Sequence, residues 1–361
     1  MTREEALEIA AAAGAEETIG APEPEIREGW LALARGSTAF WIGAVIVAIA
    51  ILFGLVSPNN VFVKADNLLT IGLNASQIML LAIGMTFLIG AAQLDLSIGF
   101  SLILASVLSA KTIVALGGTT EQVARGEYPN LALAVTAGIV VAIGAGAGIG
   151  LLNGLLVTRL RLNSFIVTLA TSGIAYGVAL ILTSAANVPF VPDQLQSGFG
   201  AAKFLGVIPY PLVVALVVAG FFWWVLRRTR FGLRTLAIGS SREAAIRAGI
   251  DVDAHLVKLF VLMGALVGVA AVFDLARNAS TNVVGHQSDN LAAIAAVVIG
   301  GTSLFGGIAS VGGSLLGTLI PVMLGNGLVI MRVEPFYQFV AVGVILILAV
   351  YFDQRRRERS S

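Results

Sequence analysis

The sequence predicts an all-α, polytopic integral membrane protein of about ten transmembrane helices, and three observations predict this class. Hydrophobic residues make up 57% of the 361 residues, which is about 206 side chains, or roughly ten spans of about 20 residues each. Charged residues reach only 12%, about half the ~25% of a typical soluble domain. The apolar stretches are continuous, whereas the strands of an outer-membrane barrel alternate apolar and polar residues. This composition excludes a large soluble enzyme with a membrane anchor.

Ten apolar runs account for the predicted spans in chain order. They lie near residues 39–56, 68–91, 99–116, 131–157, 164–184, 210–226, 258–276, 288–305, 311–330 and 335–352. Several are rich in Gly and Ser, which predicts bent or broken helices. An even number of crossings places both termini on one side of the lipid bilayer, around a transmembrane domain at residues 39–353.

The distribution of Lys and Arg predicts which side is the cytoplasm. With both termini inside, 16 of the 22 Lys and Arg residues fall in cytoplasmic segments and six fall outside. Cytoplasmic loops carry the excess of positive charge, so both termini are predicted to be cytoplasmic, in the cell inner (plasma) membrane. The termini are an acidic tail at residues 1–38, with eight Glu and three Arg, and a basic tail at 354–361. The acidic tail is either a mobile cytosolic segment or a segment that docks a partner.

Glycine is frequent, at 41 residues. Small residues four apart allow the backbones of two membrane helices to approach closely. Four pairs have this spacing: Gly144 with Gly148, Gly146 with Gly150, Gly264 with Gly268, and Gly313 with Gly317. They predict tight helix packing, and such contacts can also move during a transport cycle.

Several kinds of chemistry are excluded or not expected. The chain has no cysteine, and His255 and His286 have no second metal-type ligand at a useful spacing, so no metal site is expected. None of the four lysines follows a glycine, so the chain has no P-loop and no nucleotide cofactor of its own. No nucleophile–base–acid set appears, so no catalytic residue is assigned and no enzyme is expected. A nucleic-acid partner is not expected either.

Two acidic residues lie within the apolar region, where burying a charge is costly. Asp95 lies between two apolar runs, where it or Ser97 could accept the free N–H groups of the next helix. The alternative for both is a role in gating or solute passage. Asp274 precedes Arg277 by three residues, which predicts a local ion pair on one helix face.

Three amides are further candidates for the translocation pathway. They are Asn74, Gln77 and Gln93. Amides within spans also commonly bond neighbouring helices, so both interpretations stay open.

The most informative polar segment is the internal loop at residues 227–258. Ser240 and Glu243 predict a capping box, and Gly249 stands where a helix would stop. Between them, residues 241–248 predict a helix of about two turns. A short, doubly capped helix on the cytoplasmic side predicts insertion into a partner.

This loop resembles the EAA loop of ABC importer permeases through Glu243, Ala244, Ala245 and Gly249. Other segments resemble the ribose-type branch of that family, which imports pentoses, hexoses and related polyols. They are Asp95-Leu96-Ser97-Ile98-Gly99, Asn153-Gly154-Leu155 through residues 165–169, Thr229-Arg230-Phe231-Gly232, and residues 292–304 with Gly306-Gly307. Together they cover roughly residues 60–353.

The resemblance implies a permease subunit for carbohydrate import. Its partners would be a cytoplasmic ABC ATPase that holds ATP and Mg²⁺, an external or periplasmic sugar-binding protein, and a second permease copy in a homodimer. The ATPase-coupling residues would be Ser240, Glu243, Ala244, Ala245 and Gly249. An alternative is an ion-coupled secondary carrier for a small polar solute, which needs ionisable groups deep in its spans.

Overall fold

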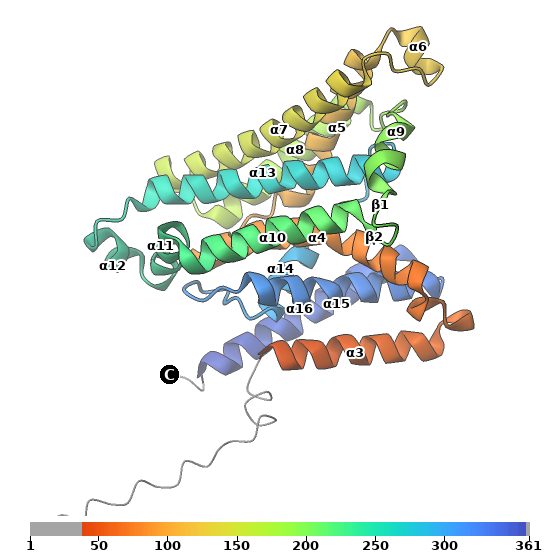
Figure 1. The fold of residues 1–361 in the computed structure, drawn as a ribbon. Coiled ribbons are helices and arrows are strands. Elements are labelled where there is room, and N and C mark those ends of the chain that lie inside the picture. Colours follow the sequence, from red (N-terminus) through yellow and green to blue (C-terminus); the bar gives the residue numbers. More distant parts are fainter. Residues whose placement is uncertain (1–37, 359–361) are drawn as a thin grey trace, which may run out of the picture.

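A computed structural model describes residues 38–358, which form a bundle of long helices (Figure 1). Within that range, eight helices are long and apolar enough to cross a membrane. They are α3 (Thr38–Val56), α4 (Ala65–Gly90), α5 (Ile98–Gly117), α7 (Leu131–Arg159), α8 (Ser164–Thr183), α10 (Tyr210–Arg228), α13 (Val252–Asn278) and α15 (Val311–Ile330). The all-α polytopic class is therefore confirmed. Residues 1–37 of the predicted acidic tail lie outside the described range.

The last long helix, α16 (Pro335–Glu358), coincides with the final predicted span at residues 335–352. It continues past residue 353 into the predicted basic tail, so the tail begins as helix. The start of α3 and the end of α16 lie on the same side of the bundle as α12 (Figure 1).

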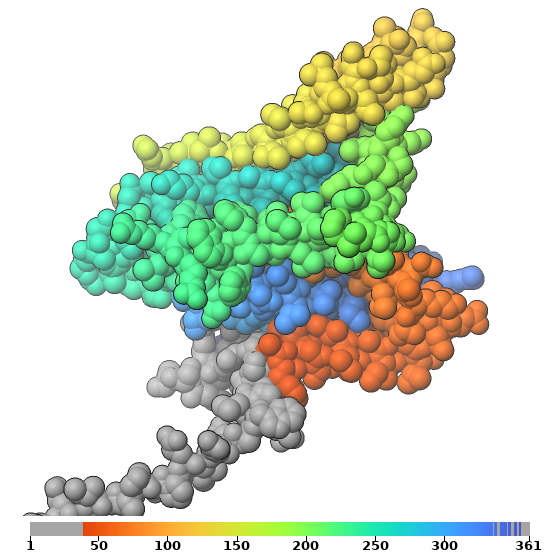
Figure 2. Space-filling view, in the orientation of Figure 1, coloured from red at the N-terminus to blue at the C-terminus, as the bar shows by residue number. Residues whose placement is uncertain are grey.

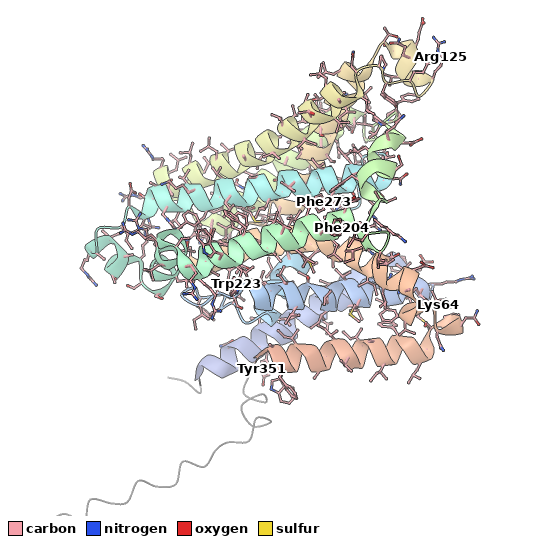
Figure 3. All side chains as sticks on the ribbon, viewed as in Figure 1. Lys64, Arg125, Phe204, Trp223, Phe273 and Tyr351 are labelled. Carbon is pink, nitrogen blue, oxygen red and sulfur yellow. The ribbon has the colours of Figure 1, made fainter. Side chains whose placement is uncertain are left out.

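Short elements mark the two ends of the bundle. One end carries η1 (Pro58–Val63), α6 (Thr120–Ala124), α9 (Asp193–Leu195), η2 (Gln196–Gly200) and the antiparallel pair β1 (Lys203–Phe204) and β2 (Ile208–Pro209). The opposite end carries α11 (Arg230–Ser240) and α12 (Arg242–Arg247). We call them the α6 end and the α12 end. The region around α6 projects beyond the rest of the molecule (Figure 2). Lys64 and Arg125 both lie at the α6 end, at opposite edges of it (Figure 3).

One predicted span differs from the structure. Residues 288–305 contain only α14 (Asp289–Ile299), a helix of 11 residues. At 1.5 Å per residue it is about 16 Å long, too short for a hydrocarbon core of about 30 Å. Non-helical residues 279–288 precede it, and Gly301 follows with a φ of +87°. Residues 288–305 are thus a continuous apolar run in the sequence, but only residues 289–299 of that run are helical.

A second non-helical segment, residues 91–97, separates α4 from α5 and contacts the start of α14, while the start of α5 contacts residue 286 of the first segment. The Asn290 side chain donates to the Leu96 carbonyl at 3.4 Å, and the Leu96 N–H donates to Thr168 Oγ1 at 3.0 Å. A Cβ at Gly99 would strike the carbonyl oxygen of His286. Irregular backbone at membrane depth needs partners from the protein, and neighbouring helices supply them here.

Helices α7 and α13 pack through a glycine seam. A Cβ at Gly146 would strike the Gly264 carbonyl oxygen, and one at Gly150 would strike that of Phe260. A Cβ at Gly268 would likewise meet the backbone of α7. The predicted pairs Gly146/Gly150 and Gly264/Gly268 therefore form one interface between α7 and α13. At each of these glycines, the backbone of the opposite helix occupies the space that a side chain would need.

The remaining glycine pairs divide. Gly313 lies against the Gly300 carbonyl and Gly317 against the Ala296 carbonyl, so they pack α15 on α14 as predicted. Gly144 and Gly148 are exposed, and a Cβ there would meet no described atom within 4 Å, so residues 38–358 do not show the packing predicted for them. Both lie on the face of α7 that turns away from α13.

Candidate functional site

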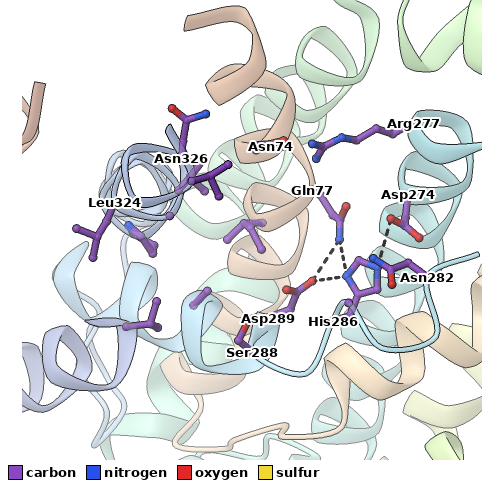
Figure 4. A pocket seen from close by; sticks show the side chains of 18 of the residues that line it. Asn74, Gln77, Asp274, Arg277, Asn282, His286, Ser288, Asp289, Leu324 and Asn326 are labelled. Carbon is purple, nitrogen blue, oxygen red and sulfur yellow. Dashed lines mark hydrogen bonds and ion pairs between the residues drawn. The ribbon is translucent and has the colours of Figure 1, made fainter. Parts of the chain in front are cut away.

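A polar pocket of about 610 Å³ lies between α4, α13, residues 279–289 and α15 (Figure 4). Its α4 residues come from the first half of that helix and its α13 residues from the last turn. Its α15 residues come from the second half of that helix. All these stretches lie toward the α6 end, so the polar pocket occupies that half of the bundle.

A buried charge cluster centred on His286 forms one wall of the pocket. His286 Nδ1 lies 2.9 Å from Asp289 Oδ2, and His286 Nε2 lies 3.3 Å from Asp274 Oδ1. The side chains of His286 and Asp274 are only 7% and 3% exposed. Each ring nitrogen thus lies near a carboxylate oxygen, Nε2 without a hydrogen bond within residues 38–358, and a positive imidazolium would offset the two negative charges. The geometry therefore favours the charged form of His286, bridging α13 to the start of α14.

Gln77, a predicted pathway residue, belongs to this cluster. Its Nε2 donates to Asp289 Oδ2 at 3.2 Å and lies 3.2 Å from His286 Nδ1. Asn74 lies one turn earlier on α4 and also lines the pocket. Its Oδ1 is buried and has no hydrogen-bond partner. The structure therefore brings together two of the three predicted amides.

Asp274 and Arg277 do not form the predicted local ion pair. Asp274 Oδ1 accepts from Asn278 Nδ2 at 2.7 Å, and its Oδ2 is buried without a hydrogen-bond partner. Within residues 38–358, the ion pair of Asp274 is with His286. The Arg277 guanidinium instead reaches across the pocket toward Asn74 (Figure 4). Asp274 therefore pairs with His286, which lies beyond the end of α13, and not with Arg277 on its own helix.

Asp95 and Ser97 lie away from the pocket, in the non-helical segment before α5. Asp95 Oδ1 accepts from the Ser97 N–H at 2.8 Å and from Ser97 Oγ at 2.6 Å. Ser97 is the N-cap residue of α5, but its side chain makes no capping bond. Asn153 Nδ2 on α7 donates to Ser97 Oγ at 3.0 Å. The capping prediction is therefore wrong: Asp95 closes the turn before the helix, and Ser97 attaches that turn to α7.

Gln93 lies near the α12 end. It lines a second cavity of about 730 Å³, together with Arg161, Arg242, Ile246 and Asp253. We call this cavity the α12 groove. Arg242 and Asp253 form an ion pair of 2.7 Å there, with side chains 50% and 49% exposed. The third predicted amide is thus separated from the polar pocket.

The predicted short helix exists as α12, but its N-cap differs. Ser241 caps it by accepting from the Ala244 N–H at 3.2 Å. Ser240 is the last residue of α11 and donates to the Leu236 carbonyl at 3.0 Å. The predicted capping box of Ser240 and Glu243 is therefore wrong. The cause is that α11 uses Ser240 to complete its own last turn.

The predicted stop at Gly249 is confirmed. Gly249 has a φ of +77° and donates to the Ile246 carbonyl at 2.9 Å, and Ile250 donates to the Ala245 carbonyl at 3.1 Å. These two bonds form a Schellman motif, which favours glycine at this position.

The predicted coupling residues do not share one surface. Ala245 is 3% exposed and packs into the core of this chain. Glu243, Ala244 and Gly249 are exposed, and so is Ile246 at 55%. Ala244 and Ile246 therefore lie on the two flanks of the buried Ala245, and both are open to a partner.

His286 and Asp289 were missed as site residues. Their spacing of three is visible in the sequence, which predicts only that His286 is not a metal ligand. In the described part of the chain, no group of three or more His, Cys, Asp and Glu side chains could hold a metal ion. The available signal was a histidine followed by an acid beside an apolar run, where a buried charge needs a partner.

Known proteins resemble this chain over most of its length. The family profile described as branched-chain amino acid transport system / permease component matches residues 67–350. D-allose transport system permease protein AlsC of Escherichia coli (strain K12) is 35% identical over 87% of this chain and 90% of that protein. Ribose import permease protein RbsC of Bacillus subtilis (strain 168) is 35% identical over 85% of this chain and 90% of that protein.

A third relative is named for a different sugar. Galactose/methyl galactoside import permease protein MglC of Escherichia coli (strain K12) is 30% identical over 88% of this chain and 95% of that protein. No solved structure matches the chain.

Proposed function

Because the chain belongs to the family of branched-chain amino acid transport system permease components, we propose that it is the membrane-spanning permease of a sugar ABC importer. It moves a monosaccharide or related polyol across the inner membrane. The chain is a transport component and not an enzyme, since ATP, Mg²⁺ and the hydrolysis of ATP belong to a partner subunit.

The main support for a sugar as the solute comes from the relatives of this chain. The family description names branched-chain amino acids, whereas allose, ribose and galactoside permeases match 85–88% of this chain at 30–35% identity. A family profile covers many substrates, so the individual relatives are the better guide. They favour a sugar.

The exposed face of α12 is the proposed contact with the ATPase. A helix of six residues is marginal in water by itself, and here a cap at each end stabilises it while Ala245 anchors it to the bundle. Ala244 and Ile246 then offer a small and an apolar side chain to a partner groove. A homodimer of permeases and an external sugar-binding protein at the α6 end complete the proposed machine.

Reconstitution tests this function against the ion-coupled alternative. The chain is placed in vesicles with its ATPase and external binding protein, and uptake of labelled D-ribose and D-allose is measured with and without ATP. ATP-dependent uptake of one of these sugars is expected. Uptake by the chain alone, driven by a proton or sodium gradient, would establish the carrier instead.

Two substitutions test the ATPase contact. Ala244→Trp and Ile246→Glu should reduce co-purification of the ATPase and uptake by at least tenfold, because both alter the exposed face of α12. Val140→Trp is the matched control, because Val140 is 65% exposed on α7, away from α12. If both α12 variants retain the ATPase and import normally, α12 is an ordinary connector.

The proposed orientation is tested by labelling. The chain has no cysteine, so each introduced cysteine is unique. Ser197→Cys at the α6 end should react with an impermeant reagent from outside, and Ser241→Cys at the α12 end only from the cytoplasm. Labelling of both from the same side would contradict the orientation.

A further inference from the structure

The polar pocket holds buried hydrogen-bonding groups that no other residue of the described range 38–358 satisfies. Asp274 Oδ2 and Asn74 Oδ1 are buried acceptors without a partner, and the Asp274 side chain is 3% exposed. They come from facing helices, α13 and α4, and both line the same cavity. A buried acceptor without a partner costs about 1–3 kcal/mol, so a molecule that donates to both would relieve that cost.

The charges of the pocket cancel. Asp274 and Asp289 carry two negative charges, and they are matched by two positive charges on Arg277 and on a His286 imidazolium, which lies within ion-pair distance of both carboxylates. An ion brought into this buried region would lack a counter-charge, and an unpaired buried charge is strongly unfavourable. A molecule without net charge meets no such penalty.

The cavity is lined by both donors and acceptors. Asp274 Oδ2 can only accept a hydrogen bond, and the Arg277 guanidinium can only donate. A hydroxyl group does both, so neighbouring hydroxyls on one molecule can serve both kinds of group. Neutral amides continue the lining at Asn278 on α13, at Asn282 in the following non-helical segment and at Asn326 on α15. Polar groups spread in this way suit a polyhydroxylated molecule better than one with a single polar end.

The size also fits a small solute. The cavity of about 610 Å³ lies within the roughly 300–1,000 Å³ of small-molecule sites. We propose that the polar pocket is a binding site within the permease for a neutral polyol of monosaccharide size, held between Asn74 on α4 and Asp274 on α13. This inference rests on the proposed function, and it adds that the permease itself recognises the solute.

Equilibrium binding to the full-length permease in lipid nanodiscs tests the site. The probes are labelled D-ribose, D-allose, L-arabinose and D-galactose, with D-gluconate, D-glucosamine and L-leucine as competitors. At least one sugar should bind saturably, and the three competitors should not displace it. Asn74→Leu and Asp274→Asn should weaken binding at least tenfold, because each removes an open acceptor.

Ser109→Ala is the matched control. Ser109 Oγ is also buried without a partner, but it lies on α5 and does not line the pocket. Its removal should leave binding unchanged. Asn74→Leu deletes an atom that bonds nothing in the fold, so this variant should remain folded, and its melting temperature checks that.

Three results overturn the inference. One is the absence of saturable sugar binding to the permease while the complete complex imports that sugar, in which case the proposed function stands and the site does not. Another is equal sugar affinity for the wild type, Asn74→Leu and Asp274→Asn. The third is Asn74-dependent binding of L-leucine in place of any sugar, which would also contradict the proposed sugar class. A complex that imports none of these sugars would refute the proposed function itself.

Discussion

The polar pocket and α12 are both polar regions of an apolar protein, yet they are built in opposite ways. The bonds of Gln77 in the pocket join residues 209 and 212 positions apart. The bonds that shape α12 join residues three to five positions apart, from Ser241 to Ile250. The pocket charges are buried, whereas the ion pair beside α12 is half exposed.

This difference teaches which region depends on the bundle as a whole. The pocket exists only while α4, α13 and α14 stay in register, so any change in helix packing reaches it. The turn and caps of α12 are local, so α12 can change its contact with a partner without disturbing the pocket. The two regions should therefore respond separately to substitution.

The largest effect is expected at the seam that holds α13 in place. In Gly150→Val, the new side chain would collide with the Phe260 backbone, so α7 and α13 could not stay packed along this seam. Little folded protein should be recovered from membranes, and sugar binding should be lost. The control is Gly148→Val, which meets no atom within 4 Å. Equal recovery of both variants would show that the seam is not needed to place α13.

A smaller loss is expected when the charge cluster is broken. His286→Leu leaves two buried carboxylates without their cation, and breaking a buried ion pair costs about 3–5 kcal/mol. Arg242→Leu, which breaks the exposed pair beside α12, should cost about 1 kcal/mol or less. Thermal unfolding in detergent measures both. Adding Asp289→Asn to His286→Leu should recover part of the loss. Equal losses of stability in His286→Leu and Arg242→Leu would show that the buried cluster does not stabilise the protein more than the exposed ion pair.

A still smaller and purely local effect is expected at Gly249. Its φ of +77° costs a branched residue about 1–2 kcal/mol, so Gly249→Val should distort the end of α12. Uptake and ATPase binding should fall, while sugar binding to the permease stays unchanged. Gly249→Asn should be nearly normal, because Asn tolerates this conformation. A loss of sugar binding in Gly249→Val would show that the two regions are coupled.

The smallest effect is expected from Asp95→Asn. An asparagine Oδ1 can accept the same bonds from the Ser97 N–H and Oγ, so unfolding and uptake should change little. Asp95→Leu removes both bonds and should lower the melting temperature. If Asp95→Asn abolishes uptake while the complex stays assembled, the carboxylate charge itself is required, and Asp95 belongs with the functional charges.

The sequence by itself determined the class of the protein and the local elements. Hydropathy decides which solvent surrounds a helix, so composition alone predicted an all-α membrane bundle. The helix around Ala244 and its stop at Gly249 were predictable because caps and turns depend on residues a few positions apart. The motifs from Asp95 to Gly307 similarly carried the family resemblance.

Only the tertiary structure decided which side chains meet. Asp274 had two possible partners, and packing of residues 279–288 against α13 selected His286 in place of Arg277. The same packing decided that Gly146 faces a helix while Gly148 does not, and that residues 288–305 hold only a short helix. Spacing along a chain gives the face of a helix, but the energy of a buried polar contact depends on the neighbour opposite, which a single helix cannot specify.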